Sequence, residues 1–152
     1  QEYASTTDLE GARLVRRDVG SSLWRPSGPI RLATQTNGLY LDGWLTWPQT
    51  TVRVWPRADG SRRGVLCLGL TQPEEAAGTL LFAGPGIDRT EPLRAGERRM
   101  FAFPVTVRRP WLLRIGAERP LTTGSRLVSA LSERPRFVEG PVGPQGAEAR
   151  CR

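Results

Sequence analysis

Residues 39–47 read LYLDGWLTW, and every odd position is apolar except Gly43. Successive side chains of a β-strand point to opposite faces, so this alternation predicts a strand with one apolar face. That inward face comprises Leu39, Leu41, Leu45 and Trp47. Pro48-Gln49 is expected to turn the chain into a second strand at residues 51–55, in which Val52 and Val54 face inward. The two strands should then pair as a hairpin.

Similar short apolar runs recur from residue 37 to residue 138, separated by Gly, Pro and Asp. Residues 64–70, GVLCLGL, are apolar at both parities, which predicts a central strand buried on both faces. Pro104 and Pro110 indicate an edge or a bulge, because proline cannot donate to a ladder. Helix signals are limited to a single turn near residues 73–77. The pattern predicts an all-β antiparallel sandwich of two sheets, jelly-roll-like, with about seven or eight core strands.

Three segments follow from this pattern. Residues 1–36 are expected to supply an N-terminal edge strand, near residues 12–17, and a covering loop. Residues 37–138 form the predicted core. Residues 139–152 are expected to be a flexible Gly/Pro tail with three Gly-x-y triplets, the collagen pattern. Three triplets are too few to hold a triple helix alone, although Cys151 beside them could join two tails covalently.

Composition argues against an enzyme. All 22 basic residues among the 152 are Arg, and there is neither Lys nor His. Imidazole bases, Ser/His and Cys/His pairs, Schiff-base lysines and the P-loop lysine are therefore excluded. A carboxylate glycosidase would need two acids across a cleft, and the spacing of the 15 acidic residues offers no such pair. No cofactor motif is present, and neither Cys nor Asp spacing marks a metal site.

The net charge of +7 and the pI of about 11.0 would ordinarily suggest an anionic partner. An all-Arg chain is also what high-GC coding sequence produces. The arginines are dispersed in doublets, such as Arg62-Arg63 and Arg108-Arg109, and no nucleic-acid-binding motif appears. The dispersal of the arginines and the absence of such a motif therefore argue against nucleic acid as the partner.

No apolar run approaches the length of a membrane span, and no signal-peptide core is present, so no membrane span is expected in this chain. The first residue is Gln1 and the sole methionine is Met100, which fits either a mature product or an excised part of a larger protein. A Cys67–Cys151 bridge is possible in an oxidising compartment. Because Cys67 lies in an apolar run and Cys151 in a polar tail, we expect instead a buried free thiol and a tail thiol open to another partner.

Aromatic residues provide the candidate binding site. By the same parity, Tyr40, Trp44 and Trp55 face away from the core. If Trp44 pairs near Arg53, then Asp42 falls near Trp55, and one outward surface results. Aromatic faces beside carboxylate and guanidinium groups suit sugar rings, whose C–H faces stack on indole while hydroxyls take polar partners. The predicted glycan-binding residues are Asn37, Tyr40, Asp42, Trp44, Arg53 and Trp55. Alternatively, residues 1–36 or another subunit cover this face.

Three phrases carry a resemblance: LDGWL at 41–45, GPGI at 84–87 and RPRFV at 134–138. With the regularly spaced strands, they resemble jelly-roll β-sandwich accessory modules of cell-envelope glycosyltransferases and glycan-processing proteins of high-GC bacteria. The resemblance implies a carbohydrate-binding or bracing role, a place outside the cell or in its envelope, and no catalytic residue.

Two functions therefore stand side by side. The first is a non-enzymatic extracytoplasmic β-sandwich that binds glycan, a cell-envelope polymer or another surface partner through its aromatic face. The second is a structural or assembly module, in which that face joins copies of a homo-oligomer, or joins the domain to a parent membrane protein, and the triplet tail belongs to a collagen-like stalk.

Overall fold

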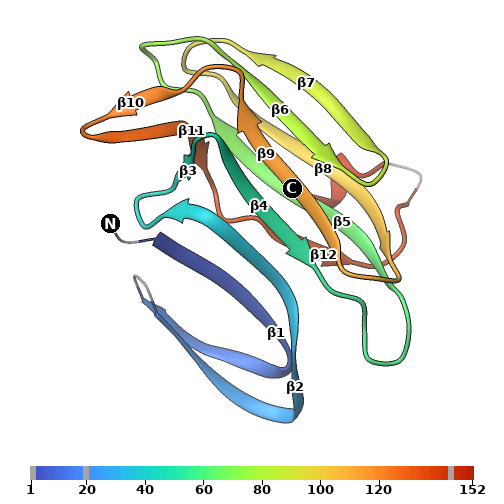
Figure 1. Cartoon of the computed structure of the whole chain (residues 1–152). Coiled ribbons are helices and arrows are strands. Elements are labelled where there is room, and N and C mark those ends of the chain that lie inside the picture. The colour runs from blue at the N-terminus through green and yellow to red at the C-terminus, as the bar shows by residue number, and fades with distance from the viewer. Residues whose placement is uncertain (1–2, 19–20, 144–145) are drawn as a thin grey trace.

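The computed structural model describes residues 3–18, 21–143 and 146–152, and its regular structure is almost entirely β (Figure 1). Every strand pair within these ranges is antiparallel. The helical structure described is a single 3-10 turn, η1 (Glu148–Arg150). The all-β prediction is confirmed. Within the described ranges, no helix has the length and apolar character needed to cross a membrane.

The strands of the described ranges are β1 (Tyr3–Asp18), β2 (Ser21–Tyr40), β3 (Trp44–Thr46), β4 (Gln49–Val54), β5 (Arg62–Thr71), β6 (Gly78–Gly84), β7 (Ile87–Leu93), β8 (Arg98–Val107), β9 (Trp111–Ala117), β10 (Leu121–Thr123), β11 (Arg126–Ser132) and β12 (Arg136–Glu139). Hydrogen bonds join them in the order β12-β5-β11-β3-β2-β4-β9-β6-β7. β1 adds to β2, β8 to β5 and β10 to β11. The short strand β3 links the two halves of the sheet, because it pairs with both β2 and β11.

Apolar side chains from the two halves meet in one core. Strands β4, β6 and β9 contribute one side of it, and β5 and β8 contribute the other. The ring of Phe82 on β6 lies 4.8 Å from that of Phe101 and 5.3 Å from that of Phe103, both on β8. Leu68 and Leu113 are completely buried there. Burial of these apolar residues is the main force that holds the two halves together.

The predicted core positions of the opening stretch are mostly confirmed. Leu39 and Leu45 are buried, and Trp47 packs against the core while its indole N–H donates to a β9 carbonyl at 3.2 Å. Trp111 on β9 also belongs to this core and is 7% exposed. Leu41 is only half-buried because it lies in a turn rather than in a strand.

That turn corrects the predicted hairpin. The chain reverses at residues 40–43, where the Gly43 N–H donates to the Tyr40 carbonyl at 3.0 Å, and not at Pro48. Gly43 has φ +90, a conformation that glycine adopts without a side-chain clash. β3 and β4 consequently run one after the other along β2 instead of pairing with each other. The pairs that define this register are Leu39–Leu45, Asn37–Thr51, Thr36–Val52, Gln35–Arg53 and Thr34–Val54.

β5 is buried on both faces, as its sequence predicts. Its inward side chains, such as Leu66 and Leu68, belong to the main core. Its outward side chains, Val65 and Cys67, form a second small apolar cluster with Cys151. β8 pairs with β5 alone among the described strands, so Pro104 lies in an edge strand as expected.

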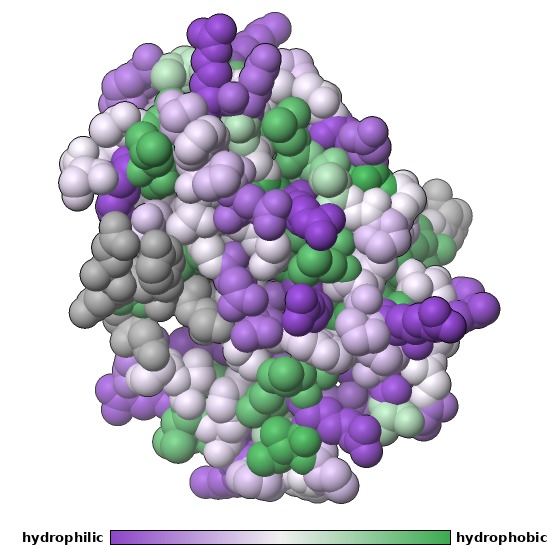
Figure 2. All heavy atoms as spheres, in the orientation of Figure 1, coloured by the Kyte–Doolittle hydropathy of each residue, from purple (hydrophilic) through white to green (hydrophobic). Residues whose placement is uncertain are grey.

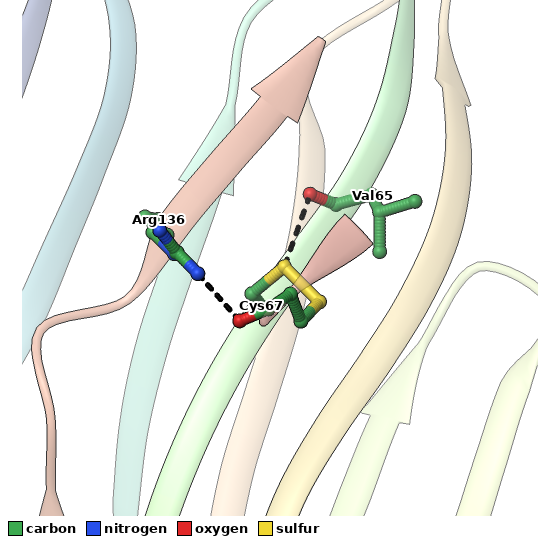
Figure 3. Close-up of a disulfide and its surroundings, with 4 residues drawn as sticks. Val65, Cys67 and Arg136 are labelled. Atoms are coloured by element: carbon green, nitrogen blue, oxygen red, sulfur yellow. Dashed lines mark hydrogen bonds between the residues drawn. A yellow bond between two sulfur atoms is a disulfide. The ribbon is translucent and has the colours of Figure 1, made fainter. Parts of the chain in front are cut away.

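The C-terminal residues 146–151 cover that outward side of β5, and the expectation of two free thiols is wrong. Cys67 and Cys151 form a disulfide, so neither thiol remains for another partner (Figure 3). Arg136 donates to the Cys151 carbonyl, as Figure 3 shows. Arg150 donates to the carbonyls of Glu139 and Pro141. These contacts hold residues 146–151 against the sheet, where they remove the small apolar cluster on β5 from water.

The segment before residue 37 also differs from expectation. Instead of one short strand and a loop, β1 and β2 form a long hairpin that curls back on itself (Figure 1). Arg17 approaches Asp8 to within 3.4 Å, although nine residues of straight strand would span about 30 Å. The bend lies at Gly11, which has φ +79 and leaves no room for a Cβ beside the Pro29 carbonyl. We call the part beyond this bend, residues 12–18 and 21–29, the returning limb.

Candidate functional site

The outward side of β4 carries the first candidate site. Val52 and Val54 are buried, so Arg53 and Trp55 between and after them point away from the core. Arg53 is exposed, and its guanidinium carbon lies 5.6 Å from the centre of the Trp55 ring. A cation–π contact of this kind holds both side chains in place and leaves part of the indole open to solvent.

Neighbouring strands extend this surface. On β2, Gln35 lies opposite Arg53 and the exposed Asn37 lies opposite Thr51. On β9, Leu112 and Arg114 are the corresponding partners. Directly opposed residues on one face have Cβ atoms about 5 Å apart, so these side chains form a single patch. We call it the β4 face, composed of Gln35, Asn37, Thr51, Arg53, Trp55, Leu112 and Arg114.

The returning limb leaves the β4 face open. Asp8 pairs with Thr34, which in turn pairs with the core residue Val54, so Asp8 lies on the core side of the sheet. Its carboxylate accepts a hydrogen bond from Thr34 at 3.0 Å and pairs with Arg17 at 3.4 Å and with Arg134 at 2.9 Å. Because the limb is attached on this side, the opposite side, with Asn37 and Arg53, stays exposed.

Arg62 binds the backbone just after the end of β4. Its side chain is 6% exposed, and its Nε donates to the Trp55 carbonyl at 3.0 Å. Its other nitrogens pair with Glu10 at 2.6 Å and with Glu139 at 3.0 Å. Arg57 also pairs with Glu139, at 3.0 Å. One buried guanidinium thus ties together β1, β12 and the Trp55 backbone, a role that an Arg-Arg doublet at a strand end does not reveal in the sequence.

Tyr40 and Asp42 belong to a second, separate cluster, which corrects the single surface predicted above. Tyr40 is 6% exposed rather than outward, and the Arg126 guanidinium carbon lies 4.6 Å from its ring centre. The same guanidinium binds both Asp42 carboxylate oxygens, at 3.2 and 2.6 Å. These hydrogen bonds lower the pKa of Asp42 below its usual range and raise that of Arg126. The carboxylate therefore stays ionised and already has its partner.

Trp44 is half-buried at the start of β3, close to the second cluster in sequence. Because β3 and β4 run consecutively, Trp44 and Trp55 are separated by up to about 35 Å of extended chain. The structure thus places Arg53 in contact with Trp55, and Asn37 lies opposite Thr51 on the same face. Tyr40 and Asp42 instead contact Arg126 in the second cluster. The turn was expected at Pro48-Gln49 but lies at residues 40–43, and the expected turn would have brought these side chains together.

A third feature, missed by the sequence analysis, is a pocket of about 630 Å³ at the end of the sheet. Loops 72–78, 93–97 and 117–121 enclose it, and Figure 1 shows these loops together at the top of the view. Gln72 on its wall is 1% exposed, and its side-chain oxygen has no hydrogen-bond partner within the part of the chain that the structure describes. Such an atom gives no signal in a sequence, because its isolation depends on tertiary packing.

Residues of metal-binding type are dispersed. In the described ranges, no group of three or more acidic or cysteine side chains gathers where it could hold an ion. The groups present at the three sites are guanidinium, carboxylate, amide, hydroxyl and indole. No protein-family model matches this chain, and the search of curated proteins gave no match either.

Proposed function

We propose that this protein is a non-enzymatic β-module that acts outside the cytoplasm and binds glycan or another cell-surface partner through its β4 face. The observation that carries the proposal is the pair Arg53 and Trp55, held 5.6 Å apart on an exposed sheet face beside Asn37. Indole stacks on the C–H face of a sugar ring, and guanidinium and amide groups hydrogen-bond to its hydroxyls.

The β4 face suits an extended polymer better than a small molecule. It lies on three adjacent strands, β2, β4 and β9, and carries the cations Arg53 and Arg114 with no acidic residue among its members. A regular sheet presents these groups at fixed spacings, which favours a repeating ligand. The cationic character favours a polymer with anionic groups over a neutral one.

The disulfide supports a place outside the cell or in its envelope. Cys67 and Cys151 are both 2% exposed, so the bond is a structural one in a closed cluster. Structural disulfides form and persist in oxidising compartments and are rare where thiols are kept reduced.

Affinity electrophoresis on immobilised polysaccharides, including anionic ones, tests the proposal. Trp55→Ala should abolish retardation and leave the thermal stability nearly unchanged, because the indole is partly exposed. Trp44→Ala is the matched control: it removes an indole at the start of β3, outside the β4 face, and should retain binding. Equal retardation of both variants and the wild type on every polymer that the wild type binds would contradict the β4 face, as would failure of the wild type to bind any.

A structural or assembly role is the second candidate, and exposed apolar residues on the hairpin favour it. The most exposed members are Leu23 at 60%, Ile30 at 51% and Val15 at 48%. Figure 2 shows apolar side chains among hydrophilic ones over the lower part of the molecule, where β1 and β2 lie. Sedimentation velocity decides between the two: a stable oligomer that Leu23→Ser dissolves supports assembly, and a monomer at high concentration supports the binding module.

A further inference from the structure

The pocket at the end of the sheet has the features of a small-ligand site. Its volume of about 630 Å³ falls within the range of about 300–1,000 Å³ that is usual for such sites. It lies beyond the last residues of β5, β7 and β9, away from the β4 face. Its wall combines apolar side chains, such as Leu93 and Ala117, with a small number of polar groups.

Gln72 is the polar residue of the wall whose side-chain oxygen lacks a partner in the described ranges. Its backbone N–H donates to the Glu97 carbonyl at 2.9 Å, which fixes the position of the residue. Its amide lies against Gly78, where a Cβ would come within 2.6 Å of the Gln72 nitrogen. The Gln72 oxygen is left as a buried acceptor without a partner in the described ranges. A buried acceptor without a partner destabilises the fold, so a hydroxyl or N–H donor that enters the pocket binds favourably there.

Charge at the pocket mouth points to an anion. Among the described residues, Arg99 is held by ion pairs with Glu97 and Glu91. Hydrogen bonds from the Arg94 backbone N–H and from Arg99 lower the pKa of Glu97, so this carboxylate is ionised and neutralised. Arg94 and Arg119 line the pocket too, are exposed, and have no ion pair within the described ranges. The exposed carboxylate of Glu118 lines the same mouth, so two guanidinium groups stand against one carboxylate, and the remaining positive charge favours a ligand with a single carboxylate.

The other lining residues further restrict the chemical class of the ligand. The described lining residues include no aromatic side chain, so a ligand here is held by hydrogen bonds and charge rather than by stacking. Aliphatic side chains and two prolines accommodate C–H groups instead. The ligand that matches all three features is compact, carries hydroxyl donors and bears a single negative charge.

We propose that this pocket binds one uronic-acid residue of an acidic glycan, with a hydroxyl donating to the Gln72 oxygen and the carboxylate held by Arg94 and Arg119. The inference rests on the proposed glycan-binding function and narrows it to acidic polymers. The β4 face would then hold a stretch of the chain, and the pocket would hold a single acidic sugar of it.

Titration of the intact protein with glucuronate, followed by NMR and calorimetry, tests this site. Glucose, which lacks the charge, and acetate, which lacks the hydroxyls, are the matched probes, and each should bind at least tenfold more weakly than glucuronate. The double variant Arg94→Gln/Arg119→Gln should lose at least tenfold in glucuronate affinity. Arg108→Gln, an exposed arginine outside the pocket lining, is the control and should leave the affinity unchanged.

Gly78→Ala provides a second variant, because its methyl group pushes the Gln72 amide out of place; it too should weaken binding at least tenfold while the protein stays folded. The inference is overturned if glucuronate binds no better than glucose or acetate, or if the pocket variants bind it as the wild type does. Loss of this site with Trp55-dependent polysaccharide binding intact would refute the pocket alone. Glucuronate binding in the pocket with no effect of Trp55→Ala on polysaccharide binding would refute the β4 face alone.

Discussion

Removing the Cys67–Cys151 disulfide should lower the free energy of unfolding by several kcal/mol. The bond joins residues 84 positions apart, so it closes a loop that includes most of the sheet. In the chain-entropy model, opening a loop of this size raises the conformational entropy of the unfolded chain and so lowers its free energy by about 4.5 kcal/mol at 25 °C. Measured losses for native disulfides in small domains fall at about 2–5 kcal/mol, because unfolded chains keep some structure.

The folded state contributes in the same direction. Without the bond, residues 146–151 are held mainly by the hydrogen bonds of Arg136 and Arg150. If this cover separates, Val65 and Met100 gain exposure on the outward side of β5. We therefore expect a loss of about 3–5 kcal/mol and a fall in Tm of about 10–15 °C for a chain of this length.

Urea denaturation followed by tryptophan fluorescence measures the effect on the Cys67→Ala/Cys151→Ala double variant. The slope m should rise relative to the wild type, because the unfolded chain without the cross-link exposes more surface. Cys151→Ala alone should match the double variant in stability, since either change removes the bond. A loss below about 1 kcal/mol with an unchanged m would refute the reasoning, as would two reactive thiols in the unfolded, unreduced wild type.

Three further predictions concern single contacts. Arg62→Met should cost about 2–3 kcal/mol in urea denaturation, because two partly exposed carboxylates, one of them Glu10, lose their buried partner; an unchanged midpoint would contradict this. The lowered pKa of Asp42 means that its contact with Arg126 stabilises the fold above about pH 4 and ceases to do so as the pH falls through the folded-state pKa. Carboxyl NMR should place the Asp42 midpoint below that of the Arg126→Gln variant, and equal midpoints would refute it. Gly11→Ala should destabilise the hairpin bend by more than about 1 kcal/mol in thermal denaturation, since its Cβ meets a backbone oxygen.

Local patterning predicted the elements whose environment is set by their own residues. The alternation of Val52 and Val54 with Arg53 is confirmed on β4, and the double-sided apolar run 64–70 is confirmed as the buried strand β5. Period-two burial follows directly from pleat geometry, so it can be read from a single strand. The all-β class follows from the repetition of such runs.

The position of the first turn could not be read so directly. Asp42-Gly43 and Pro48-Gln49 are both turn signals, and the sequence analysis chose the second. The structure turns at the first, where the Gly43 N–H donates to the Tyr40 carbonyl. Because side chains alternate along each strand, a displaced turn changes which aromatic residues share a surface.

Long-range partners account for the other differences. Tyr40 is covered by Arg126, and Asp42 is paired with it, although Asp42 and Arg126 are 84 positions apart in the chain. The disulfide spans the same separation. Polar flanks around Cys151 gave no indication that the segment returns to β5, since the apolar patch that it covers lies 84 positions earlier in the chain. Such contacts depend on the assembled sheet and have no local signature.

The hairpin bend has a consequence for the way the molecule opens. The returning limb is hydrogen-bonded within itself, and most of its described side chains are exposed, whereas β5 pairs with β8 along one edge and with β11 and β12 along the other and has both faces covered. Local opening of the limb therefore breaks few buried contacts and need not disturb β5, which can open only when the whole domain unfolds. Backbone amides of the returning limb should accordingly exchange quickly with deuterated solvent. Those of β5 should exchange only at the slow rate set by global unfolding.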